Sequence, residues 1–196
     1  GFSQEYDDLD SQDSRNAALG IDFTEKQFKG GMSVLRRLID LPVTGVGDYG
    51  STEQVERILD SYVTYSFNRN LALSLQWLHL ARKIDDTGLY FGVVRQSEQD
   101  VVPVHLDVFA DGPYSFRLTQ SYFRQEFDLL GDDARGEESV WVTDISMRYR
   151  FPHRLGAASL GVNNMFDEGE EILSASGGTL AFYPGRFFVV AFNLNI

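Results

Sequence analysis

The stretch that decides the fold is Arg186–Ile196, which reads RFFVVAFNLNI. Every second residue from Phe188 onward is large and apolar, whereas the positions between them become small or polar towards the end. Because successive side chains of a β-strand point to opposite faces, this period of two predicts a strand with one wholly apolar face.

The same period of two recurs along the chain and is held for longer than most soluble strands need. In Tyr114–Tyr122, for example, Phe116 and Leu118 alternate with Arg117. Aromatic side chains also suit a pleated surface. We therefore predict nine complete strands and regard residues 2–6 as the tail of a tenth; the nine cover about 15–23, 28–41, 53–67, 71–83, 101–110, 114–127, 139–151, 155–165 and 184–196.

The connections between these strands alternate in length. Short turns are expected at 24–27, 68–70, 111–113 and 152–154, and long acidic loops at 42–52, 84–100, 128–138 and 166–183. Transmembrane barrels have short turns on one rim and long loops on the other. The sequence therefore predicts an all-β, antiparallel, up-and-down transmembrane β-barrel with about ten strands in this chain, alone or as part of a larger barrel. Aromatic residues near the strand ends are expected to form girdles at the membrane interfaces: Tyr65, Phe67, Trp77, Tyr114, Tyr122, Trp141, Tyr149 and Phe151.

The last third of the chain also resembles a known group of proteins. Val140–Pro152 and the run Asn163-Asn164-Met165-Phe166-Asp167-Glu168 resemble the closing strands of bacterial outer-membrane barrels. The second run is similar to the Asn-Leu-Phe-Asp element near the end of TonB-dependent receptors, and the region also resembles the barrels that end tetratricopeptide-repeat envelope proteins. One departure is Ile196, because such barrels usually end in an aromatic residue.

This resemblance implies a place in the cell outer membrane. Residues 1–196 would form one barrel domain, the C-terminal segment of a polypeptide whose upstream residues are missing here. The expected partners are outer-membrane lipid and lipopolysaccharide, the barrel insertion machinery acting on the last strand, and a periplasmic domain or TonB.

Composition narrows the chemistry. A net charge of −12 argues against binding nucleic acid, which needs a clustered positive surface. The chain has no cysteine, and its three histidines lack the spacing of metal ligands. No arrangement typical of a nucleophilic triad or a carboxylate pair is found. We therefore expect neither an enzyme nor a bound metal or cofactor.

Seven charged or ionisable residues fall on the face opposite the apolar one, where they would line the inside of a barrel. The arginines could form a path for an anionic or sugar-like solute, or they could pair with the acids to fill a narrow interior. The functional hypotheses are transport of a solute or polymer, anchoring of a periplasmic domain, TonB-dependent uptake, and a soluble β-barrel binding module. The seven candidates are Asp60, His105, Asp107, Arg117, Asp144, Arg148 and Arg150.

Overall fold

The computed structural model describes residues 13–45, 48–84, 94–129, 135–169, 171–173, 180–182 and 185–194. Nine strands form one antiparallel sheet, and two short strands form a separate hairpin. The bounds in the sheet are β1 Asp13–Glu25, β2 Phe28–Gly45, β3 Asp48–Asn68, β4 Leu71–Ile84, β5 Val94–Phe109, β6 Tyr114–Leu129, β7 Arg135–Arg150, β8 Gly156–Asn163 and β11 Phe187–Leu194; the hairpin pairs β9 Glu171–Leu173 with β10 Leu180–Phe182.

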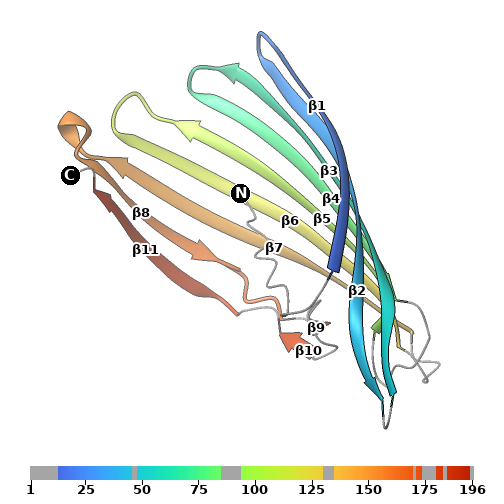
Figure 1. The fold of residues 1–196 in the computed structure, drawn as a ribbon. Helices are drawn as coiled ribbons and strands as arrows, with labels where there is room; N and C mark the ends of the chain where they lie inside the picture. Colours follow the sequence, from blue (N-terminus) through green and yellow to red (C-terminus); the bar gives the residue numbers. More distant parts are fainter. Residues whose placement is uncertain are drawn as a thin grey trace.

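The sheet follows the chain in simple up-and-down order, β1 through β8 and then β11. Figure 1 shows it as one curved sheet whose open edges are β1 and β11. The predicted all-β, antiparallel, up-and-down arrangement is confirmed, with nine strands in the sheet where about ten were expected in the chain. The sheet is not closed on itself, and residues 2–6 lie outside the described residues.

The short connections lie at one end of the strands and have the local chemistry of tight turns. Lys26, between β1 and β2, has a φ of 50°. Between β3 and β4 the backbone N–H of Asn70 donates to the side chain of Asn68 at 2.8 Å. After the short helix Pro152–Arg154, Gly156 has a φ of 136°, and a Cβ there would collide with the carbonyl oxygen of Asn193. Only glycine fits at this position.

The connections at the other end of the strands are shorter than the sequence predicted. The expected loop 42–52 is wrong in extent, because β2 and β3 remain paired up to Gly45 and Asp48. Likewise β5 already begins at Val94 and β7 at Arg135. The added residues of β5 and β7, 95–100 and 135–138, are mostly polar, so they lack the alternation by which strands are recognised. Backbone hydrogen bonds continue the ladder there regardless of side-chain polarity.

Candidate functional site

The register of the nine strands gives the sheet two distinct faces. Leu118 of β6, for example, lies directly opposite Leu106 of β5 and Ile145 of β7. Because paired residues point to the same side, the alternating apolar residues of all nine strands gather on one surface, here called the apolar face. Its most exposed large members are Leu19, Ile21, Phe23, Phe28, Met32, Trp141, Leu160, Phe188, Val190, Phe192 and Leu194.

The opposite face, here called the polar face, is the more crowded of the two. Gln125 is 1% and Val142 2% exposed there, whereas Phe188 on the apolar face is 72% exposed. Side chains converge on the concave side of a curved sheet and diverge on its convex side. The polar face is therefore concave, and the apolar face is convex.

Aromatic residues on the apolar face fall at two levels. Near the short turns, Phe28 packs on Tyr65 with ring centroids 4.6 Å apart, and Tyr114 packs on Tyr149 at 5.1 Å. At the other level, Tyr122 of β6 packs on Trp141 of β7 at 4.9 Å. The apolar residues of the convex side lie between these two levels, and we call this zone the apolar belt.

We call the level of Tyr122 and Trp141, which lies away from the short turns, the upper aromatic level. Beyond it, the polarity of the two faces is reversed. The convex side becomes charged, as at Arg57, Asp100 and Arg124. In the same region the concave side has apolar residues in the first two rows, followed by the charged row Arg37–Glu56–Arg82. Directly paired residues there form two continuous rows, Leu35–Ile58–Leu80 across β2 to β4 and Leu78–Val101–Phe123–Val140 across β4 to β7.

The charges beyond the belt are partly neutralised within the sheet. Arg124 donates through Nε to Glu137 Oε1 at 2.9 Å and also pairs with Glu126. On the concave side, Arg37 lies 3.9 Å from Glu56. Burial lowers the pKa of neighbouring Arg82 from its ordinary value, and the Glu56 carboxylate opposes that shift.

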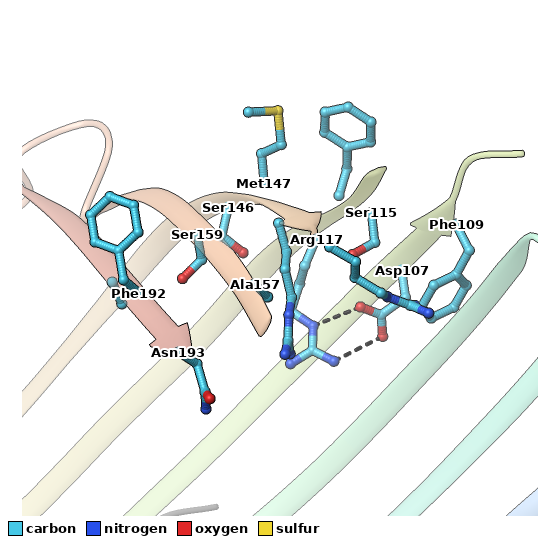
Figure 2. A pocket seen from close by; sticks show the side chains of 14 residues that line it. Asp107, Phe109, Ser115, Arg117, Ser146, Met147, Ala157, Ser159, Phe192 and Asn193 are labelled. Carbon is cyan, nitrogen blue, oxygen red and sulfur yellow. Dashed lines mark hydrogen bonds and ion pairs between the residues drawn. The ribbon is translucent and has the colours of Figure 1, made fainter. Parts of the chain in front are cut away.

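Four of the seven candidate residues come together in a hollow of about 730 Å³ on the turn side of the concave face. Arg117 makes a two-pronged contact with Asp107, with Nε at 2.7 Å from Oδ1 and the second nitrogen at 3.1 Å from Oδ2. Figure 2 shows this pair projecting on the side of the sheet away from Met147 and Phe192. Arg148 and Arg150 line the same hollow, and neither has an ion-pair partner among the described residues.

Three candidates lie outside this hollow. Asp60 of β3 accepts a hydrogen bond from Gln76 Nε2 at 2.9 Å. His105 Nδ1 lies 2.9 Å from Thr119 Oγ1 on the neighbouring strand. Both are on the polar face, but each is engaged with a neutral neighbour.

Asp144 has a structural role. Its Oδ1 accepts the backbone N–H of Asn164 at 2.8 Å, and Asn164 is fully buried. The side chain of Asn164 donates through Nδ2 to the carbonyl oxygen of Glu168 at 2.7 Å, and its Oδ1 accepts the backbone N–H of Glu168 at 3.0 Å. The Asn-Asn-Met-Phe-Asp-Glu run therefore forms a compact turn that is fastened to β7 by Asp144.

The hollow also contains hydroxyl and amide side chains that were not predicted as site residues. These are Ser115, Ser146, Ser159 and Asn193. The same alternation that selected Arg117 and Arg148 also places them on the polar face, so the signal was present. Alternation alone does not distinguish them from other polar residues of this face, because they carry no charge.

Comparisons with protein-family models, with curated proteins and with solved structures give no match to this chain. Within the described residues, no helix is long and apolar enough to cross a membrane. Those residues also contain no group of three or more acidic or histidine side chains placed to hold a metal ion.

Proposed function

We propose that this chain forms part of the wall of an outer-membrane β-barrel, with its convex face towards lipid and its concave face lining a path for a solute or polymer. The observation that carries the proposal is the exchange of polarity at the level of Trp77, Tyr122 and Trp141. A soluble barrel or sandwich keeps its apolar side chains inside along the whole length of each strand. Here they face outward below that level, and in the two rows just beyond it they face inward while the convex side carries Arg57, Asp100 and Arg124, as expected where a sheet leaves lipid for water.

The height of the apolar belt fits a membrane. From Trp141 to Phe151 the chain makes about 10 residue steps, or about 33 Å along the strand. With the usual tilt of about 40°, this spans roughly 25 Å, which is the height of the apolar band in outer-membrane barrels. The strands that run past the belt would then stand in water on the side of the long connections.

Closure of the sheet requires further strands. β1 runs towards the short turn at Lys26. β11 also runs towards the end of the sheet that carries the short turns, because Leu194 pairs with Gly156 next to one of them. Two strands that run in the same direction cannot pair antiparallel. An odd number of additional strands must therefore lie between β11 and β1 in an all-antiparallel barrel, which makes the total even, as in bacterial single-chain barrels.

The hollow with Arg117, Arg148 and Arg150 supports a path for an anionic or hydroxyl-rich solute. Guanidinium groups bind carboxylates and phosphates through parallel hydrogen bonds, and serine and asparagine side chains suit sugar hydroxyls. Anchoring of a periplasmic domain needs the same wall but no such lining. The two roles therefore differ in whether the purified full-length protein conducts solute across a planar bilayer.

The membrane assignment can be tested with adjacent residues that point to opposite faces. The chain has no native cysteine, so Ile145→Cys and Ser146→Cys each give a single site for an environment-sensitive fluorophore. In phospholipid vesicles, we expect the label at 145 to emit as if in lipid and to resist water-soluble quenchers, and the label at 146 to be quenched. Equal quenching at both sites, or the reverse pattern, would overturn the proposal.

A further inference from the structure

An arginine pair stands on the convex face just above the apolar belt. Arg36 of β2 lies directly opposite Arg57 of β3, and the next outward-facing pair towards the turns is Val34 with Leu59. Both arginines are exposed. They border a shallow hollow of about 620 Å³ whose lining also includes Leu19, Val34, Leu59 and His79. The hollow is therefore apolar towards the belt and basic at its upper rim.

Carboxylates of Glu53 and Glu98 border the hollows beside the pair, but neither forms an ion pair with it in the described part of the chain. Like charges directly opposite each other across two strands destabilise a sheet. Neither Arg36 nor Arg57 makes an ion pair or side-chain hydrogen bond to any described residue. Glu98 also borders the hollow, but there it accepts a hydrogen bond from Gln96 at 3.2 Å. By contrast, Arg124 on the same face is matched by Glu126 and Glu137.

We infer that Arg36 and Arg57 bind the phosphate groups of a lipid headgroup, with the lipid chains lying along Leu19, Val34 and Leu59. This rests on the proposed membrane orientation, which places the pair two residue steps along the strands above Val34 and Leu59, where headgroup phosphates lie. Two guanidinium groups side by side offer several donors to one phosphate, and its charge removes their repulsion. In the proposed membrane the matching lipid is the phosphorylated glucosamine headgroup of lipopolysaccharide.

Energy transfer from Trp77 measures binding at this hollow. Trp77 lies on the same face beside His79, with ring centroids 6.2 Å apart, and Trp141 is the only other tryptophan. In a Trp141→Phe background, the full-length protein is reconstituted in phosphatidylcholine vesicles and titrated with dansyl-labelled diphosphoryl lipid A. We expect saturable transfer, weakened about 20-fold or more in the double variant Arg36→Gln/Arg57→Gln. The double variant Arg36→Lys/Arg57→Lys keeps the charges but loses the guanidinium donors, so its affinity should lie between those of the wild type and the glutamine variant.

The matched control is Arg124→Gln, which removes one positive charge from the same face and should change the affinity less than threefold. The inference is overturned if the double glutamine variant binds as wild type, if Arg124→Gln weakens binding equally, or if the dephosphorylated lipid binds as well. Displacement by millimolar inorganic phosphate would overturn assignment to a lipid. If the wild type fails to insert in vesicles, the proposed function itself fails; if it inserts and binding ignores the arginines, only this inference does.

Discussion

A charge placed in the middle of the apolar belt provides a sensitive test of the membrane orientation. Leu118 is 42% exposed and lies on the convex face, four residues from each of the aromatic levels marked by Tyr114 and Tyr122. That is about 13 Å along the strand from either level, which places the side chain near the midplane of the proposed bilayer. We expect Leu118→Arg to lower the free energy of unfolding by about 2–4 kcal/mol in lipid vesicles.

The measurement is urea unfolding of the protein in phospholipid vesicles, where this loss should lower the midpoint by roughly 1–2 M. Ser139→Arg is the matched control, because Ser139 is on the same face of β7 but beyond Trp141, outside the belt. It should cost less than about 1 kcal/mol. If the two variants lose the same amount, or if Leu118→Arg costs nothing, the convex face does not lie in lipid and the reasoning fails.

Three further predictions concern the concave face and the turns. Asp144→Ala should lower the free energy of unfolding by about 1–3 kcal/mol because it leaves the N–H of buried Asn164 without an acceptor, while Asp144→Asn should lose less; urea unfolding measures both. Gly31→Ala should also cost about 1–3 kcal/mol, since its Cβ would lie 2.8 Å from the Tyr62 ring and 3.0 Å from the carbonyl oxygen of Ile21, whereas Gly169→Ala has open space and should be neutral in the same assay. If the protein conducts, Arg148→Ala should reduce its preference for anions in planar-bilayer recordings, and Arg36→Ala, which removes the same charge from the convex face, should not; equal effects would contradict a path along the hollow.

The strands could be predicted from the sequence because alternation is a local property. In β6 the residues Tyr114, Phe116 and Leu118 are enough to show both the strand and its apolar face. The full length of the strands could not be predicted in this way. Residues 94–100 are mostly polar on both faces, and only pairing with β4 and β6 shows that they continue β5.

The exchange of faces was visible in the sequence but needed the register to interpret. Along β4 the apolar residues shift from odd positions, such as Leu75, to even positions, Leu78 and Leu80. A single strand with such a shift could contain a bulge. Only the pairing of Leu78 with Val101 and Val101 with Phe123 shows that neighbouring strands share it.

The sequence predicts which face of the sheet each candidate residue occupies, but it does not predict which of these residues lie together. Alternation alone assigns Asp107 and Arg117 to the same face. Their direct pairing depends on the turn at 110–113, which sets the register of β5 and β6. The role of Asp144 depends on a turn twenty residues further along the chain, and no local pattern shows such a contact.

The paired strands β2 and β3 continue well past the level where the convex surface changes from apolar to charged. From Leu59 to Asp48 the ladder is unbroken, about 11 residue steps or about 36 Å along the strands. Allowing for tilt, the tip of this ribbon would stand off the bilayer by roughly 27 Å. In the proposed orientation, a large particle that approaches the cell would contact this two-stranded projection before it reached the lipid, whereas a small solute would pass beside it.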